Sequence, residues 1–346
     1  MRTIGELKDV LALLGVTDVK TAIPHGGGHI NETYKVETAS GRVLILQRVN
    51  EAIFDLPILE KNVIRVTEYL RSRGVPTLEI LAYKGAWRLM TFCAGESQDV
   101  VREPAQAYCV GRAFAQFQDA LADLPPPRLQ EVIPHFHDTP HRLQMLDEAC
   151  RADVKGRLSA VSAELDFVAA RREAAGRLVN GLAQGRIPER ITHNDTKINN
   201  VLIGGEGSVT VIDLDTVMPG AALYDFGDMV RTSTALAAED EPNLARVGSR
   251  KDYFEALVRG YLAGAKFLTE AEKDELVFAG QLMTFEVGVR FLTDYLSGDT
   301  YFHTAYSEHN LIRARNQFAM VASLEAQDSE YTALVEAIRK EEKSKL

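Results

Sequence analysis

The sequence predicts an α+β fold in two lobes, a small N-lobe built on an antiparallel sheet and a larger, mostly helical C-lobe. Strand-like segments come first along the chain and helical segments follow. Glycine-containing breaks separate the early segments, as in successive hairpins. A small flexible stretch, Ala94-Gly95-Glu96, divides the two patterns. We therefore expect the lobes to comprise residues 1–95 and 96–346.

The N-lobe pattern begins with a short helix and continues into hairpins. Between Thr21 and Val49, apolar and polar residues alternate around Gly26-Gly27-Gly28 and around Ser40-Gly41. Such alternation between turn residues is typical of antiparallel strands. The expected elements, in order, are a helix over residues 4–14, these hairpins, a helix over 57–73, and strands over 78–83 and 87–92.

The C-lobe pattern is helical apart from one short strand-rich segment. Helices are expected over residues 105–124 and 162–182, separated by the helix-breaking run Pro125-Pro126-Pro127 and a histidine-rich stretch. Residues 191–215 contain two short apolar strands with polar loops. The remainder is expected to be helical up to the charged tail.

Composition limits the classes of partner. The 346 residues are 46% hydrophobic and 25% charged, which is ordinary globular usage. The formal net charge is −10, and no run of Lys and Arg offsets it locally. This charge disfavours binding to nucleic acid or to an anionic membrane. We expect a small or neutral partner instead.

The chain is expected to be cytoplasmic and to have no disulfides. No stretch approaches the roughly 18 apolar residues of a membrane span, and the N-terminal residues lack the apolar core of a signal peptide. The cysteines, Cys93, Cys109 and Cys150, are odd in number and widely spaced. We therefore interpret them as small buried thiols.

A polar loop between two apolar runs carries the strongest chemical signal. In the segment 191–203, Asp195 and Asn200 stand five positions apart. Phosphoryl transfer needs a carboxylate beside the acceptor hydroxyl and an amide oxygen that holds magnesium on the phosphates. The spacing is that of a kinase catalytic loop. It predicts Asp195 as the catalytic residue and Asn200 as a magnesium ligand.

A second carboxylate motif follows 13 residues after Asn200, in Val211-Ile212-Asp213-Leu214-Asp215. Here an apolar strand ends in an aspartate that could complete the magnesium site. Because Mg²⁺ accepts few protein ligands and keeps waters or phosphate oxygens, Asn200 and Asp213 with a triphosphate would suffice. Asp215 is then expected to support these ligands or to join them occasionally.

The glycine run and the third strand are expected to bind ATP. Backbone amides of Gly26, Gly27 and Gly28 could cover the phosphates. A kinase normally carries a lysine on the third strand, but this chain has Gln47 there, followed by Arg48.

We expect Arg48 to supply the missing positive charge, and we also assign Lys197 to the nucleotide. The missing lysine leaves open a nucleotide-binding pseudokinase. Against that alternative, the aspartates and the asparagine of the reaction centre are all present.

Two further motifs have structural interpretations. His135, His137 and His141 have a spacing that suggests a metal site, but no cysteine or further histidine lies nearby to complete tetrahedral coordination. We expect structural or lid roles for them. In Asp225-Phe-Gly-Asp228, Asp225 is expected to cap the start of a helix.

Several blocks of sequence resemble the bacterial N-acetylhexosamine 1-kinases, within the aminoglycoside-phosphotransferase and choline-kinase superfamily. They extend from about residue 25 to residue 317. The blocks are Gly28-His-Ile-Asn31, His135-Phe-His-Asp-Thr-Pro-His-Arg142, His193-Asn-Asp-Thr-Lys197, Asp213-Leu-Asp-Thr-Val-Met-Pro-Gly220, Asp225-Phe-Gly-Asp228, Arg290-Phe-Leu-Thr-Asp-Tyr-Leu296 and Glu308-His-Asn-Leu311.

This resemblance implies a protein kinase-like bilobal fold that binds ATP between its lobes, with ATP and Mg²⁺ as cofactors. It also implies phosphorylation of N-acetylglucosamine or N-acetylgalactosamine at the anomeric hydroxyl. By position, the sugar pocket of the family carries over to His29, Asp195, Arg290 and Tyr301.

The acceptor remains open at one point. Where the sugar kinases can have an aromatic residue after the arginine of the helix that starts at Asp225, this chain has Arg231-Thr232. A lost ring would weaken apolar packing against the sugar. Another acceptor for the same fold, such as an aminoglycoside, homoserine or choline, is the alternative.

Overall fold

A computed structural model of the chain describes residues 2–26, 30–204 and 209–344. The predicted α+β fold, with an antiparallel sheet in the N-terminal part and helices in the C-terminal part, is confirmed. The division into lobes at residue 95 stays a prediction. By contacts, the first compact unit comprises Met1–Ser97, Asp123–Pro134 and Val201–Met218, and the second Gln98–Ala122, His135–Asn200 and Pro219–Leu346.

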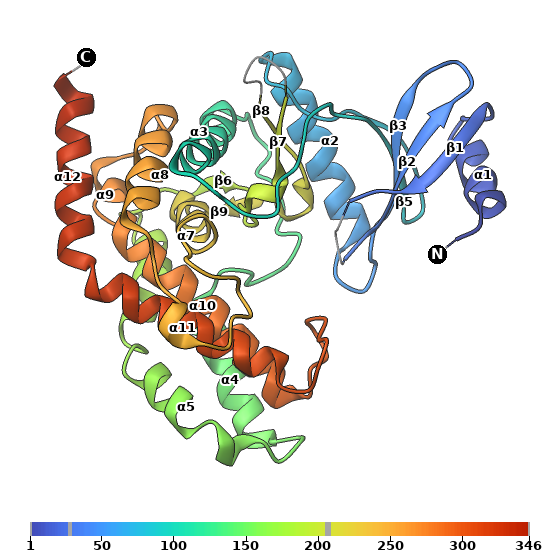
Figure 1. The fold of residues 1–346 in the computed structure, drawn as a ribbon. Helices are drawn as coiled ribbons and strands as arrows, with labels where there is room; N and C mark the ends of the chain where they lie inside the picture. The colour runs from blue at the N-terminus through green and yellow to red at the C-terminus, as the bar shows by residue number, and fades with distance from the viewer. Residues whose placement is uncertain (1, 27–29, 205–208, 345–346) are drawn as a thin grey trace. The chain divides into compact units, whose positions relative to one another are not determined.

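A five-stranded antiparallel sheet forms the centre of the first unit, with strand order β1-β2-β3-β5-β4 (Figure 1). In the register of the central strands, Gln47 of β3 pairs with Thr33 on one side and with Arg88 on the other. The strands are β1 (Val19–Pro24), β2 (Glu32–Thr38), β3 (Val43–Arg48), β4 (Ile80–Lys84) and β5 (Trp87–Thr91).

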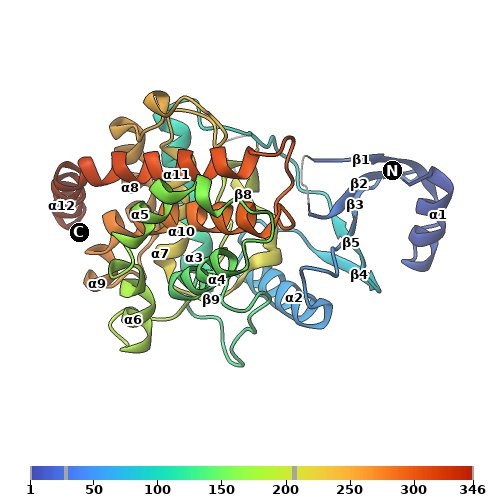
Figure 2. The ribbon, with the colours of Figure 1, turned by 90° about the horizontal axis from the view of Figure 1, so that it is seen from below.

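Helix α1 (Ile4–Leu13) lies beside this sheet (Figure 2). A capping box formed by Thr3 and Glu6 fixes its start. Its buried Leu7 and Leu11 pack in one cluster with apolar side chains of the sheet, including Leu44 and Leu46. Because side chains alternate along a strand, the residues of the third strand that neighbour Leu44 and Leu46 face the side of the sheet away from α1.

Helix α2 (Leu56–Ser72) contacts the two later segments of the first unit, residues 123–134 and 201–218. Asp55 caps it by accepting from the main-chain N–H of Ile58 at 3.1 Å. The buried Asn62 side chain donates to the carbonyl groups of Gln130 at 2.8 Å and Val217 at 3.2 Å. The latter segment contains the hairpin β7 (Val201–Ile203) and β8 (Val209–Val211), followed by the 3-10 helix η5 (Leu214–Thr216).

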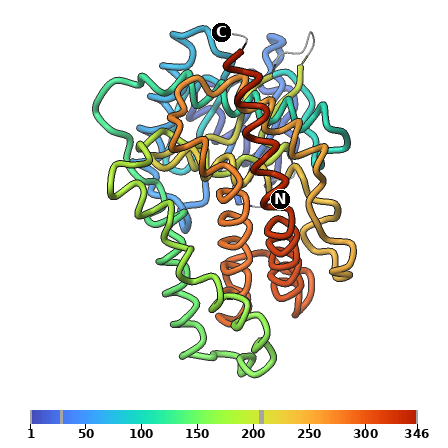
Figure 3. Tube along the Cα trace, turned by 90° about the vertical axis from the view of Figure 1, so that its left-hand side faces the viewer, coloured from blue at the N-terminus to red at the C-terminus, as the bar shows by residue number. Residues whose placement is uncertain are grey.

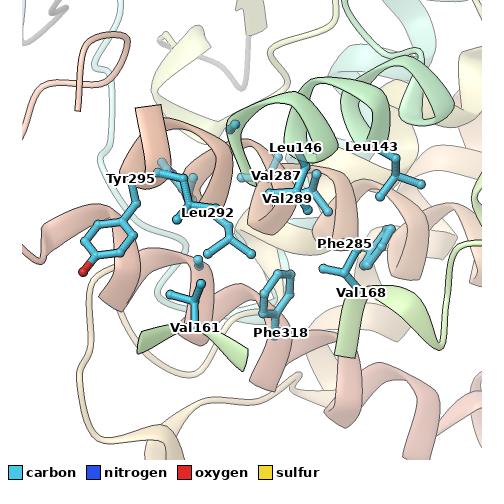
Figure 4. Close-up of a cluster of buried hydrophobic side chains, with 14 of the residues drawn as sticks. Leu143, Leu146, Val161, Val168, Phe285, Val287, Val289, Leu292, Tyr295 and Phe318 are labelled. Carbon is cyan, nitrogen blue, oxygen red and sulfur yellow. The ribbon is translucent and has the colours of Figure 1, made fainter. Parts of the chain in front are cut away.

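The second unit is helical around a core between α4, α10 and α11, which lie side by side (Figure 3). Its buried apolar side chains come from these helices and α5, as Leu146, Phe285, Leu292 and Phe318 illustrate (Figure 4). The α-helices are α3 (Pro104–Leu121), α4 (Thr139–Ala152), α5 (Ser162–Ala169), α6 (Arg177–Ala183), α7 (Ala222–Ser233), α8 (Lys251–Gly264), α9 (Glu270–Lys273), α10 (Leu276–Ser297), α11 (His309–Ala326) and α12 (Asp328–Ser344).

Helices α3 and α8 pack with their backbones in contact. A Cβ atom at Gly260 would overlap the carbonyl of Tyr108, and one at Gly111 would lie 3.0 Å from the main-chain nitrogen of Tyr261. Only glycine allows such an approach.

Two helical predictions differ from the structure. Residues 162–182 do not form one helix, because α5 ends at Ala169 and a turn separates it from the 3-10 helix η2 (Ala174–Gly176) and α6. In this turn Arg171 binds Glu325 at 2.6 Å and Arg172 binds Asp147 at 2.6 Å. These carboxylates lie on different helices, and local apolar spacing cannot indicate them. Helix α4 was not predicted, since its few apolar residues follow a polar stretch.

One described helix, α10, is long and apolar enough to cross a membrane by length and composition. Its most apolar window is 72% buried inside the structure. It is the central helix of the core in Figure 4.

Candidate active site

The predicted reaction centre lies between β6 (Arg190–Thr192) and the 3-10 helix η3 (Ile198–Asn200). The Asn200 side-chain amide donates to the main-chain carbonyl of Asp195 at 2.8 Å and to its Oδ2 at 3.0 Å. The Lys197 ammonium lies 2.8 Å from the other carboxylate oxygen, Oδ1. Three predicted site residues therefore meet at one carboxylate.

The surroundings of Asp195 stabilise its charge. Burial alone would raise the pKa of this carboxyl, but the adjacent Lys197 and the hydrogen bond from Asn200 hold the pKa below its ordinary value. In turn, Asp195 raises the pKa of Lys197. The carboxylate is thus ionised at neutral pH, as a proton acceptor must be, and 29% of the side chain is exposed.

Two carboxylates of α7 hold the backbone of this loop. Asp225 accepts hydrogen bonds from the main-chain N–H groups of His193 at 2.8 Å and Asn194 at 2.7 Å. Asp228 accepts one from the N–H of Thr196 at 2.9 Å. Successive N–H groups of the catalytic loop are therefore directed at fixed negative charges, which sets the position of Asp195 between them.

The prediction that Asp225 caps its helix is wrong. Helix α7 begins after Ala221, which makes no capping bond through its side chain, and Asp225 lies within the first turn. Its buried carboxylate also accepts from Gln118 at 2.7 Å, and burial raises its pKa. A carboxylate near a helix start fits a cap by local pattern, but its partners here come from a distant loop.

Asn194 explains how this loop turns. Its backbone is left-handed, with φ 65°, a conformation that asparagine tolerates better than most residues. Its side-chain oxygen accepts from the Thr192 hydroxyl at 3.0 Å. The same conformation is favourable for glycine.

A buried histidine braces the loop from the other side. His137 Nδ1 lies 2.7 Å from Glu286, and its Nε2 lies 3.3 Å from the carbonyl oxygen of Asn194. The Thr139 hydroxyl donates to the second oxygen of Glu286 at 2.6 Å. Since a carbonyl oxygen can only accept, Nε2 carries the hydrogen in this contact.

The neighbouring histidines are arranged differently. His135 is exposed and lies 2.8 Å from Asp138, and its ring is 4.6 Å from that of His141. Among the described residues, no group of three or more His, Cys, Asp or Glu has the arrangement of a metal site.

Arg290 of α10, which the resemblance assigns to the sugar pocket, lies among aromatic rings. Its guanidinium carbon lies 5.0 Å from the ring centroid of Phe136, 5.9 Å from that of Tyr301 and 5.7 Å from that of Phe302. The structure thus brings together Arg290 and Tyr301, and their assignment to a sugar pocket stays a prediction. His29, the remaining residue of the predicted sugar pocket, lies outside the described residues.

The segment that carries Tyr301 is fixed by one buried aspartate. Asp294 accepts from the main-chain N–H groups of Thr300, Tyr301 and Phe302 at 2.8–2.9 Å, and from the Asn310 amide at 2.8 Å. The Tyr301 side chain itself is exposed. A rigid backbone therefore presents a ring that is free to contact a ligand.

In the first unit, the two aspartates after β8 have opposite environments. Asp213 is exposed and its backbone is left-handed, with φ 58°. Asp215 is buried, with Oδ1 at 2.6 Å from Arg88 and Oδ2 accepting from the Asn31 amide at 2.7 Å. Asp215 therefore supports the turn through these contacts, and its expected role beside the magnesium ligands stays a prediction.

The third strand places Gln47 and Arg48 on opposite faces of the sheet. Gln47 accepts from Arg88 at 2.9 Å and donates to Thr33 at 2.8 Å. Arg48 lies on the face of the α1 leucines, where it pairs with Glu32 at 3.6 Å and Glu51 at 3.3 Å. Its assignment to the nucleotide stays a prediction.

The predicted magnesium ligands suit the ion chemically. Because the Asn200 nitrogen faces Asp195, its amide oxygen is available to a cation, and Asp213 offers an exposed carboxylate. Amide and carboxylate oxygens are the ligands that Mg²⁺ accepts. The two residues belong to different units.

The predicted glycine loop is only partly described. Gly26 has a left-handed φ of 79°. Gly27 and Gly28 lie outside the described residues.

Sequence reasoning missed several residues that the geometry brings forward. Arg88 could have been found by pairing β3 with β5, because it stands opposite Gln47 in that register. Phe136 lies inside a motif that was noted only for its histidines. Glu286 stands in an apolar helix pattern that does not indicate its partner, and the residues around Phe302 carry no motif that marks it as a site residue.

Comparison with known proteins gives a family and a fold. The sequence profile described as "Phosphotransferase enzyme family" matches residues 21–266. An ethanolamine kinase of Plasmodium vivax is 15% identical, with a TM-score of 0.59 over 89% of this chain and 84% of that one.

Two further solved structures are similar over nearly their whole length. A choline kinase of Cryptosporidium parvum is 14% identical, with a TM-score of 0.58 over 95% of this chain and 99% of that one. An aminoglycoside phosphotransferase with bound ADP is 11% identical, with a TM-score of 0.60 over 93% and 99%. These likenesses concern the fold.

Proposed function

Since the chain belongs to the phosphotransferase enzyme family, we propose that it transfers the γ-phosphate of ATP to the anomeric hydroxyl of an N-acetylhexosamine. The observation that carries the proposal is the arrangement at Asp195, a half-buried carboxylate kept ionised by Lys197 and oriented by Asn200. ATP as the donor agrees with the ADP bound to the similar aminoglycoside phosphotransferase.

In the proposed reaction, Asp195 accepts the proton of the attacking hydroxyl. The Asn200 amide holds the carboxylate in place through its nitrogen, and Lys197 keeps it ionised. Lys197 would also contact the nucleotide. Asn200 and Asp213 would hold Mg²⁺, which neutralises charge on the phosphates when bound. His29, with the backbone of Gly26, Gly27 and Gly28, remains part of the proposed ligand sites.

The charges around the acceptor residues favour a neutral sugar. Burial and the neighbouring charge of Arg290 lower the pKa of Arg142, which donates to the carbonyl of Phe136 at 2.8 Å. Arg142 and Arg290 are close enough to interact electrostatically, and both would repel a cationic acceptor such as an aminoglycoside or choline. The rings of Phe136 and Tyr301 can instead pack on a sugar face or an acetyl methyl group.

A carboxylate-bearing acceptor such as homoserine is the second candidate. The observation that favours it is the same pair of arginines, because a guanidinium binds a carboxylate through paired hydrogen bonds. A screen of ATP consumption with N-acetylglucosamine, N-acetylgalactosamine, homoserine and choline separates the two candidates. Turnover of homoserine without turnover of either sugar would contradict the sugar proposal.

The position of phosphorylation has its own test. Attack by the sugar oxygen on phosphorus leaves the anomeric C–O bond intact, so the bound configuration is retained, and we expect the α-1-phosphate. Phosphorus NMR should show coupling to the anomeric proton. A methyl glycoside of N-acetylglucosamine, which lacks a free anomeric hydroxyl, should not react; its turnover, or coupling to the C6 protons, would overturn the assignment.

The role of Asp195 is tested by Asp195→Asn, which keeps the shape of the side chain and removes its basicity. We expect a folded protein with kcat lowered on the order of 10²–10⁴-fold. Near-normal turnover of the folded variant would exclude Asp195 as the base.

A further inference from the structure

The third strand lacks its expected cation but binds one from a neighbouring strand. Kinases pair a lysine of this strand with a helix glutamate and with the nucleotide phosphates. Here Gln47 Oε1 accepts from Nε of Arg88, its partner on β5, at 2.9 Å, and Gln47 Nε2 donates to Thr33 at 2.8 Å. Gln47 therefore orients the guanidinium group of Arg88 on the sheet face opposite α1.

The second partner of this guanidinium is the buried aspartate of the turn after β8. Arg88 Nη2 lies 2.6 Å from Asp215 Oδ1, and each side chain is only 3% exposed. Asn31, at the start of the second strand's hairpin, donates to Asp215 Oδ2 at 2.7 Å and accepts from the main-chain N–H of Asn50 at 3.0 Å. A continuous polar network thus ties three strands to the turn.

The charge balance of the turn depends on Arg88. Asp213 and Asp215 place two carboxylates in one turn, of which Asp213 is exposed and left-handed. Without a cation, the buried Asp215 would be left with a single neutral donor and would repel Asp213. With Arg88 in place, the charge of Asp215 is cancelled and its carboxylate is fixed, so that Asp215 no longer repels Asp213.

We propose that Arg88 is a positioning residue that replaces the third-strand lysine: it fixes Asp215 and thereby holds Asp213 in the conformation that receives the magnesium ion of Mg·ATP. The inference rests on the proposed function, because it assigns a role toward the nucleotide of that reaction. Another cation gives a matched comparison. Lys35 lies on the same sheet face, 4.9 Å from the Phe92 ring.

The test is the affinity for ATP, measured by calorimetry with Mg²⁺ and with EDTA. In Arg88→Met, the gain in affinity that Mg²⁺ gives the wild type should shrink by at least about tenfold, whereas affinity in EDTA should not change. Arg88→Lys should retain part of the gain. Lys35→Met should retain all of it. A gain from Mg²⁺ that is as large in Arg88→Met as in the wild type would overturn the proposal.

A double variant separates positioning from stability. Arg88→Met alone leaves a buried carboxylate without a counter-charge and should lower the melting temperature. Arg88→Met with Asp215→Leu replaces the ion pair by apolar side chains, which should restore the melting temperature. The double variant should still lack the gain in ATP affinity that Mg²⁺ gives the wild type. If the double variant shows this gain, the ion pair serves stability only and the proposal fails. A wild type without any gain would instead contradict the proposed function.

Discussion

Two segments hold a candidate functional carboxylate in place by different interactions. One is the predicted catalytic loop of the second unit, and the other is the turn of the first unit that carries Asp213 and Asp215, called here the aspartate turn. Each contains a left-handed residue other than glycine at its functional carboxylate: Asn194 precedes Asp195, and Asp213 is itself left-handed. The catalytic loop is held by main-chain N–H groups that donate to Asp225 and Asp228. The aspartate turn is held by the ion pair of Asp215 with Arg88.

This difference determines how each motif can fail. A left-handed residue costs roughly 1–2 kcal/mol and persists only where the surrounding structure requires it. Removing a carboxylate from α7 leaves neutral amides without partners, whereas removing Arg88 leaves a buried charge. The catalytic loop should therefore weaken gradually under substitution, and the aspartate turn should fail abruptly.

The largest expected effect tests the exposed carboxylate of the aspartate turn. In Asp213→Asn the backbone conformation is tolerated, but the charge that we propose for metal binding is lost. We expect the activity to fall by at least about 100-fold and a higher Mg²⁺ concentration to be needed in a titration with ATP present. Asp252→Asn, on the exposed first turn of α8, removes a charge without this role and is the control. An unchanged Mg²⁺ titration would remove Asp213 from the metal site.

A smaller effect is expected from the support of the catalytic loop. In Asp225→Asn, one carboxylate oxygen becomes an NH₂ group that faces a main-chain N–H donor. An unsatisfied buried group of this kind costs about 1–3 kcal/mol. We expect a loss of that size in the free energy of unfolding, measured with denaturant, and a fall in kcat on the order of 10–100-fold from misplacement of Asp195.

The loss of unfolding free energy in Asp225→Asn can be compared with its loss of kcat, to show whether α7 positions the base or only supports the fold. If Asp225→Asn loses stability and retains full activity, α7 supports the fold without positioning the base. Asp119→Asn, on α3, changes a carboxylate outside this hydrogen-bond network and should alter neither quantity.

The fold class was accessible from sequence, and the candidate reaction centre could be proposed from it, because their signals are local. The order of strands before helices predicts the fold class, which is confirmed, and Asp195, Lys197 and Asn200 lie within six residues of one another. Their spacing is set by one loop. No tertiary information is needed to propose them together.

The supports of the site were not accessible, because they depend on pairing between distant segments. Arg88 stands 41 positions from Gln47, and the two meet only because β3 pairs with β5 instead of with β4. Glu286 stands 149 positions from His137 and lies on a helix whose pattern is apolar. A charged residue in such a pattern is visible in the sequence, but its partner is not.

The smallest effect concerns the charge beside the base. Because Lys197 holds the pKa of Asp195 below its ordinary value, Lys197→Gln should raise that pKa. The base works only when ionised, so its function is lost as the pH falls through this pKa. The acid limb of the pH profile of kcat/KM should therefore move to higher pH in Lys197→Gln, with little change near neutral pH from this cause.

The same profile distinguishes tuning of the base from nucleotide binding. Lys197→Arg keeps a cation at this position and should leave the acid limb in place. If Lys197 acts on the nucleotide alone, Lys197→Gln should raise the KM for ATP without moving the acid limb. If both change, the ammonium bridges the base and the transferring group, which its position at 2.8 Å from Asp195 allows. An acid limb that does not move would mean that Asp195 keeps its charge without Lys197, and that the hydrogen bond from Asn200 is enough to hold its pKa down.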